Sequence, residues 1–194
     1  MLTDLPNVLT LSRIAAIPVL VALVAVRLPV TDVAAASLFV VAAITDWLDG
    51  KLARDRAQIS DLGRMLDPIA DKLLVGATLM LLVGFVRLPV GGIYPAIVIM
   101  LREILVSGLR EYLAGLRVGL PVTRLAKWKT AAQMVALALL LLGDAGAAKI
   151  GVPQVPVTAI GGALLWIAAL LTLVTGWDYL TAGLRHVSQA RTAS

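Results

Sequence analysis

Long apolar segments constrain this chain more than any other feature of its sequence. Six of them alternate with short connections that contain proline or glycine, and they cover residues 6–26, 33–51, 67–86, 94–113, 126–142 and 157–177. About 20 apolar residues cross the hydrocarbon core of a bilayer as a helix. Since 60% of the 194 residues are hydrophobic and only 15% are charged, the chain has too few polar residues to cover the surface of a soluble domain. The sequence predicts an all-α polytopic membrane protein with six transmembrane helices, forming a single integral membrane domain over residues 1–194.

The second and third segments must carry charged residues into the membrane. Their uncharged runs contain only 13 and 14 residues, which is shorter than one crossing. Counting about 20 residues from the uncharged ends places Asp46 and Asp49 roughly 4 to 9 Å inside one membrane face. The same count places Asp67 at the edge and Asp71 about 6 Å inside. Because consecutive spans run in opposite directions, we expect the four aspartates to meet at one face.

Four carboxylates in this pattern favour a divalent cation. The spacings of three between Asp46 and Asp49 and four between Asp67 and Asp71 put each pair on one face of its helix. A charged residue inside a membrane costs about 2.5 to 3.5 kcal/mol on insertion scales and usually marks a functional site. Oxygen ligands, without cysteine and with one histidine in the chain, suit Mg²⁺ or Mn²⁺ rather than zinc. The alternative is a set of loop charges that only stop membrane transfer, and the predicted depth argues against it.

The distribution of lysine and arginine predicts the orientation. Basic residues crowd the connections on the aspartate side and the C-terminal tail, whereas the opposite connections hold only Arg27, Arg87 and Lys149. The positive-inside rule therefore places the aspartates and both termini in the cytoplasm of a bacterial-type inner membrane, with an organelle membrane as the alternative. The net charge of +5 suits topology and anionic substrates, and no nucleic-acid partner is expected.

The residues around the aspartates form a longer pattern with eight fixed positions over 26 residues. These positions are Asp46, Asp49, Gly50, Ala53, Arg54, Gly63, Asp67 and Asp71. The pattern resembles, without departure, the complete signature of the CDP-alcohol phosphotransferase family. Three less specific motifs, at residues 6–13, 101–114 and 127–130, resemble the phosphatidylglycerophosphate synthases of that family.

The resemblance implies a fold, an activity and a set of partners. It implies six transmembrane helices, usually in a homodimer, around a polar cavity open to the cytoplasm. The implied reaction transfers the phosphatidyl group from CDP-diacylglycerol to glycerol 3-phosphate, giving phosphatidylglycerophosphate and CMP. Other acceptors in the same family are phosphatidylglycerol, serine, inositol and inositol phosphate, and they stay open as alternatives.

The resemblance also implies roles for single residues. Asp46, Asp49 and Asp67 are expected to hold two metal ions, while Asp71 contributes to the metal site and acts as the base. The residues expected to bind the CDP part are Asp46, Asp49, Gly50, Ala53, Arg54, Asn7 and Thr10.

Basic residues in the second half of the chain are candidates for the phosphate of the acceptor. They are Arg102, Arg110, Lys127 and Lys129, and they favour glycerol 3-phosphate over an uncharged alcohol. Arg102 has an equally good alternative as the partner of Glu103 in a structural ion pair.

Two alternatives come from other functional classes. A divalent-cation transporter would explain carboxylates in the membrane but not the spacing of Gly50, Ala53, Arg54 and Gly63. A structural membrane subunit would predict no metal-dependent activity.

Two further features have simpler interpretations. Trp128, Trp177 and Tyr179 are expected to be interfacial anchors, because they lie near predicted helix ends. The small residues at positions 161–163 predict a close approach of helices, inside the protomer or across a dimer.

Overall fold

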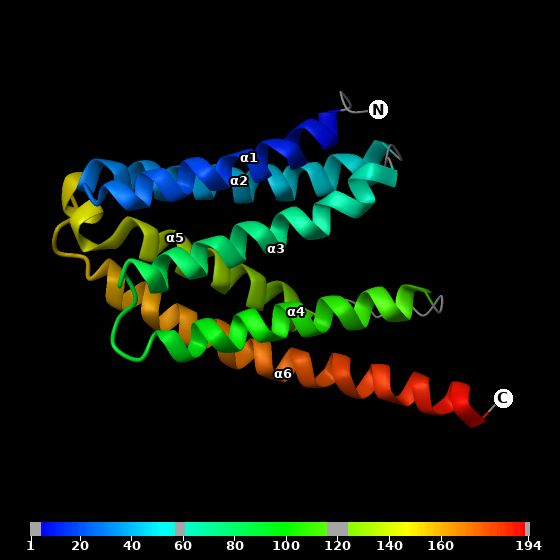
Figure 1. The fold of residues 1–194 in the computed structure, drawn as a ribbon. Coiled ribbons are helices and arrows are strands. Elements are labelled where there is room, and N and C mark those ends of the chain that lie inside the picture. The colour runs from blue at the N-terminus through cyan, green and yellow to red at the C-terminus, as the bar shows by residue number, and fades with distance from the viewer. Residues whose placement is uncertain (1–4, 57–60, 116–123, 193–194) are drawn as a thin grey trace.

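The chain folds into six long helices that run back and forth in alternating directions (Figure 1). The computed structural model describes residues 5–56, 61–115 and 124–192, with side chains described except at 5–7, 47–56, 61–65, 67, 178 and 182–192. The helices are α1 (Leu5–Val26), α2 (Pro29–Arg56), α3 (Asp61–Gly84), α4 (Ile93–Gly115), α5 (Arg124–Lys149) and α6 (Val157–Thr192). The described ranges contain no strand. The prediction of an all-α chain with six helical segments is confirmed.

The helix ends differ from the predicted segments where the sequence becomes polar. α2 extends past both ends of the predicted range 33–51, and α6 continues to Thr192 instead of ending at residue 177. Hydropathy reports the apolar part of a helix, while its polar ends continue on helix propensity alone. The predicted end at residue 142 instead marks a kink in α5, because Gly143 has a non-helical conformation with φ of 60° and ψ of 174°.

Four helices are long and apolar enough to cross a membrane, within the residues that the structure describes. Their candidate spans are Val8–Val26, Pro29–Asp46, Arg124–Lys149 and Val157–Thr181. The structure therefore supports an all-α membrane protein, but hydropathy does not mark α3 and α4 as spans. α3 carries Asp67, Asp71 and Lys72. α4 carries two arginines and two glutamates, and these four side chains line the cavity described below together with Asp71 and Lys72 of α3.

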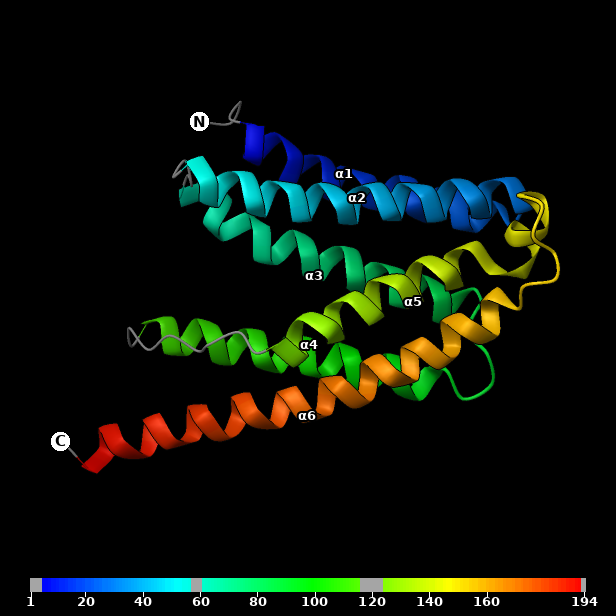
Figure 2. The ribbon, with the colours of Figure 1, turned by 180° about the vertical axis from the view of Figure 1, so that it is seen from behind.

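The helices pack in a ring whose order differs from their order in the chain. α5 packs against α6 and α2, α1 packs against α2 and α3, and α4 packs mainly against α6. The contact between α3 and α4 is much smaller, so the ring is loosest there. Figure 2 shows α5 crossing in front of α3 and α4, and it packs between α2 and α6. Phe39, Leu82, Ile99 and Leu137 are among the fully buried side chains that fill the core.

Glycines in α6 allow its close approach to two neighbours. A Cβ atom on Gly161 would lie 2.9 Å from Cγ of Leu140, and one on Gly162 would lie 2.4 Å from Cγ of Pro89. Neither site has room for a methyl group. The predicted close approach at these small residues is confirmed, and it occurs inside the protomer.

A buried ion pair closes the end of the bundle opposite the aspartates. Arg87 Nη1 lies 2.6 Å from Asp32 Oδ1, and both side chains are largely buried. Arg87 also donates hydrogen bonds to the carbonyl of Val24 in the last turn of α1 and to the carbonyl of Leu141 beside the α5 kink. Carbonyls at helix ends lack helical partners. One guanidinium thus satisfies backbone groups of α1 and α5 and compensates the charge of α2.

We expect Gly162→Ala to destabilise the protein by about 1 to 2 kcal/mol, because the rigid ring of Pro89 cannot move away from the new methyl group. Gly84→Ala is the matched control, since a Cβ there meets nothing within 4 Å. Thermal unfolding of both variants in the same detergent measures the difference. Equal melting temperatures would show that α6 does not press against Pro89.

Candidate active site

A cavity of about 1310 Å³ lies between α2, α3, α4 and α5, with Tyr179 of α6 also in its wall. Its lining includes Asp46 from the second half of α2 and Asp71 from the first half of α3. The end of α2 and the start of α3 lie on the same side of the bundle as both termini (Figure 1). Charged side chains make up much of its described lining. The acidic ones are Asp46, Asp71, Glu103 and Glu111, and the basic ones are Lys72, Arg102, Arg110, Lys127 and Lys129.

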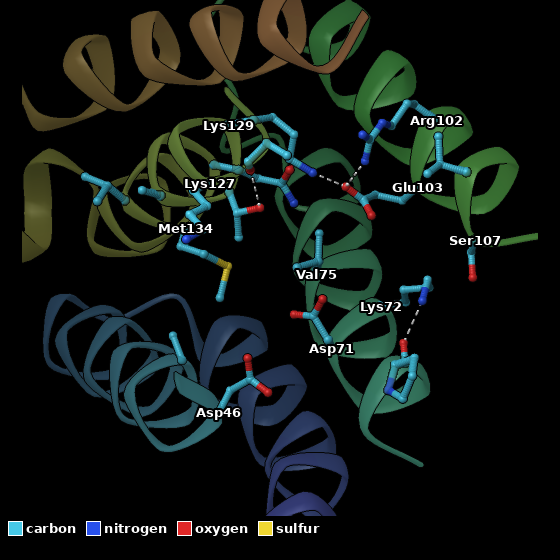
Figure 3. A pocket seen from close by; sticks show the side chains of 18 of the residues that line it. Asp46, Asp71, Lys72, Val75, Arg102, Glu103, Ser107, Lys127, Lys129 and Met134 are labelled. Atoms are coloured by element: carbon cyan, nitrogen blue, oxygen red, sulfur yellow. Dashed lines mark hydrogen bonds and ion pairs between the residues drawn. The ribbon is translucent and has the colours of Figure 1, made fainter. Parts of the chain in front are cut away.

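Two signature aspartates face this cavity from different helices. Figure 3 shows Asp46 of α2 and Asp71 of α3 pointing into the same space. Asp49 and Asp67 belong to the same two helices, one turn away, but their side chains lie outside the described residues. The predicted CDP contacts at Asn7, Gly50, Ala53 and Arg54 also lie outside the residues whose side chains are described. The structure thus brings together two of the four predicted metal ligands and leaves the other side chains as predictions.

The donor atoms at this wall suit a hard cation. Carboxylate oxygens facing a polar cavity are the ligands that Mg²⁺ and Mn²⁺ prefer. Among the described side chains, no group of three or more potential metal ligands occurs. The complete ligand set therefore depends on Asp49 and Asp67, and the residues that are described fit the predicted metal.

Asp46 is held from behind by an arginine of α1. Arg13 is 2% exposed, and its Nη1 forms an ion pair with Oδ1 of Asp46. Thr10, which is fully buried, accepts a hydrogen bond of 3.5 Å from Nη2 of Arg13. Thr10 is not among the described lining residues, so its contact with CDP stays a prediction. The motif at residues 6–13 contained a signal for Arg13, an arginine inside an apolar segment, but its partner on α2 could not be predicted from the sequence.

All four predicted acceptor residues line the cavity. Arg102 and Arg110 come from α4, while Lys127 and Lys129 come from α5. The ion pair of Arg102 with Glu103 is confirmed at 3.5 Å, and the same Oε1 atom also pairs with Nζ of Lys129 (Figure 3). Since Lys129 is 4% exposed, Glu103 provides the counter-charge that its burial requires. The two alternatives for Arg102 are therefore compatible, because a paired residue also forms the cavity wall.

α6 fixes the two arginines of α4. The ring of Tyr179 lies 5.6 Å from the guanidinium carbon of Arg102 and 5.1 Å from that of Arg110. Arg110 donates a 3.1 Å hydrogen bond to the Tyr179 hydroxyl, and Arg102 donates one of 3.1 Å to Oγ1 of Thr175. Gly176 leaves room for the stem of Arg102, since a Cβ there would lie 3.1 Å from its Cγ. These contacts orient both guanidinium groups before any ligand binds.

The prediction that Tyr179 is an interfacial anchor is wrong, because the side chain is only 4% exposed and lies between two arginines. Tyr179 contacts two arginines of α4, and α4 is not adjacent to α6 in the sequence. Trp128 and Trp177 are 70% and 67% exposed, as expected for anchors.

The arrangement combines two chemical functions. Carboxylates on α2 and α3 can take up a proton or hold a cation, and basic groups on α4 and α5 can bind an anion. Arg102 Nε has no hydrogen-bond partner among the described residues, although it is buried. A buried donor without a partner is costly, so a bound anion would relieve it.

Residues 3–174 match the sequence profile described as CDP-alcohol phosphatidyltransferase. The chain belongs to this family. Three similar proteins are each named CDP-diacylglycerol–glycerol-3-phosphate 3-phosphatidyltransferase. The one from Rickettsia bellii is 47% identical over 92% of this chain and 94% of its own length. Those from Cereibacter sphaeroides and Bacillus subtilis are 40% and 37% identical, over 97% and 92% of this chain and 99% and 94% of their own lengths.

Glu103→Leu should destabilise the protein by about 3 kcal/mol, because Lys129 would stay buried without its carboxylate partner. Adding Lys129→Met to this variant should restore much of the loss, since both charges are then absent. Thermal unfolding in detergent measures each variant. Glu111→Leu, which replaces an exposed glutamate on the same helix, is the control and should change stability little. Similar losses in the two single variants would contradict a special role for Glu103.

Proposed function

We propose that this member of the family transfers the phosphatidyl group from CDP-diacylglycerol to glycerol 3-phosphate in phospholipid biosynthesis, giving phosphatidylglycerophosphate and CMP. One observation carries the proposal: signature carboxylates and the four basic residues that suit an acceptor phosphate line the same cavity. The names of the similar proteins support glycerol 3-phosphate over the other acceptors.

The metal belongs to this proposal. Asp46, Asp49, Asp67 and Asp71 would hold two divalent cations, either Mg²⁺ or Mn²⁺. When bound, these ions supply positive charge for the pyrophosphate of CDP-diacylglycerol and for the departing CMP. Arg13 holds the carboxylate of Asp46 at the cavity wall. The residues proposed to contact the CDP part are Asp46, Asp49, Gly50, Ala53 and Arg54, with Asn7 and Thr10.

The reaction requires a base beside the acceptor hydroxyl. The terminal hydroxyl oxygen of glycerol 3-phosphate forms a bond to the phosphorus that carries diacylglycerol. The bond from this phosphorus to the CMP oxygen breaks, and CMP leaves with the electron pair. The proton of the hydroxyl passes to the carboxylate of Asp71, which faces the cavity. Arg102, Arg110, Lys127 and Lys129 would hold the phosphate of the acceptor and so orient its hydroxyl toward Asp71.

We further propose that all six helices cross the membrane. α3 and α4 direct charged residues into the cavity, while their exposed positions include Met80, Leu101 and Ile104, which are 64% to 70% exposed. The charged residues lower the average hydropathy of such a helix, although its outer face is apolar. Both termini lie at the end of the bundle where the connections are rich in lysine and arginine, and five basic side chains line the cavity, which supports a cytoplasmic location. The homodimer is proposed from the family resemblance alone.

Purified protein in detergent, given labelled CDP-diacylglycerol and Mg²⁺, should release CMP when glycerol 3-phosphate is added. Serine, inositol, inositol phosphate and phosphatidylglycerol should give little release of CMP. Serine, inositol and phosphatidylglycerol lack a phosphate monoester, and inositol phosphate lacks a terminal hydroxyl. Release with one of these acceptors would overturn the substrate and keep the mechanism. No release with any acceptor would favour transport or a structural role.

Asp71→Asn should lower turnover by about 10² to 10⁴, because the amide cannot take the proton from the acceptor. Binding of CDP-diacylglycerol, measured separately, should be largely retained. Asp144→Asn is the control: Asp144 accepts a hydrogen bond from the backbone of Thr158 outside the cavity, and the amide oxygen can do the same. Near-normal turnover in Asp71→Asn would remove Asp71 from the role of base.

A further inference from the structure

Gln133 is a buried polar residue in the cavity wall whose role the proposed reaction leaves open. It belongs to α5, it is 2% exposed, and it lines the cavity. Its Oε1 atom is buried and has no hydrogen-bond partner within the described part of the chain. Most buried polar atoms in proteins have a partner, and leaving an acceptor without one costs about 1 to 3 kcal/mol. The Oε1 atom of Gln133 therefore has no donor from the described part of the chain and can accept a hydrogen bond from a ligand.

The position of Gln133 relates it to the acceptor residues. It follows Lys129 by four residues in α5, so the two side chains lie on one face of the helix, one turn apart. Lys129 is held by Glu103, and this pair faces the same space as Asp71 (Figure 3). Gln133 thus belongs to the same cavity as both the proposed phosphate site and the proposed base.

Glycerol 3-phosphate presents three polar groups to such a cavity. Its phosphate is matched by the basic residues of α4 and α5, and its terminal hydroxyl is matched by Asp71 in the proposed reaction. The middle hydroxyl does not react and keeps its proton. It therefore needs a hydrogen-bond acceptor when it is removed from water. The four basic residues cannot provide one, because lysine and arginine are donors only.

We propose that Gln133 is a specificity-determining residue whose Oε1 accepts a hydrogen bond from the middle hydroxyl of the acceptor. The inference rests on the proposed function, since it assumes glycerol 3-phosphate in this cavity. A site that binds a hydroxyl through a buried acceptor rejects an analogue without it, because the acceptor is then left without a partner. Gln133 would thus distinguish glycerol phosphates from simpler hydroxyalkyl phosphates.

The test compares glycerol 3-phosphate with 3-hydroxypropyl phosphate, which keeps the phosphate and the terminal hydroxyl but lacks the middle one. Purified full-length protein is assayed in detergent with CDP-diacylglycerol and Mg²⁺, and kcat/KM is measured for both acceptors. The unmodified protein should prefer glycerol 3-phosphate by roughly tenfold or more. In Gln133→Met, kcat/KM for glycerol 3-phosphate should fall toward that for the analogue, so that the ratio approaches one. Met134→Leu, a substitution at the adjacent lining residue, should keep the original ratio.

Folding and function are separated by two further readouts. The melting temperature of Gln133→Met without substrate should not fall, because the change removes a buried acceptor that has no partner among the described side chains. An unchanged preference, an equal loss for both acceptors, or a clear loss of stability would each overturn the role proposed for Gln133. If the unmodified protein uses another alcohol but not glycerol 3-phosphate, the proposed function fails first and the inference fails with it.

Discussion

The compensation of charge inside an apolar bundle is the constraint on which the rest of this structure depends. Each ion pair that provides this compensation joins distant parts of the chain: Asp46 with Arg13, Glu103 with Lys129, and Asp32 with Arg87. A helix with a buried charge can pack in only a few positions, because its partner on another helix must be within reach. Apolar contacts alone allow many such positions in lipid, where little hydrophobic force acts between helices. The ion pairs therefore help to select the arrangement that encloses the cavity.

The two ends of the bundle use the same interactions for different purposes. Arg87, at one end, contacts Asp32 and two backbone carbonyls, so most of its donors are already used. Arg102, in the cavity, contacts Glu103 and Thr175 but has a buried Nε atom without a hydrogen-bond partner in the described chain. A fully satisfied cation stabilises a fold, whereas a partly satisfied one has capacity for a ligand.

The sequence was sufficient for features that depend on one helix at a time. The six segments follow from apolar runs, and the convergence of Asp46 with Asp71 follows from their depth and the alternation of spans. The roles of Arg13, Tyr179 and Gln133 depend on which helices are neighbours, and the ring order is not the order of the chain. A pattern within α6 cannot reveal that Tyr179 contacts α4. For the same reason, the sequence predicted the pairing of Glu103 with adjacent Arg102 but not with distant Lys129.

The contacts also divide the site into two parts. Asp46 and Asp71 come from the first three helices, where the signature lies, and the basic residues proposed to bind the acceptor come from α4 and α5 with support from α6. These halves meet mainly through α2 and α5, while the contact of α3 with α4 is small. Because the two walls come from different helices, substitutions in α4, α5 or α6 can alter the basic wall without moving the carboxylates of α2 and α3.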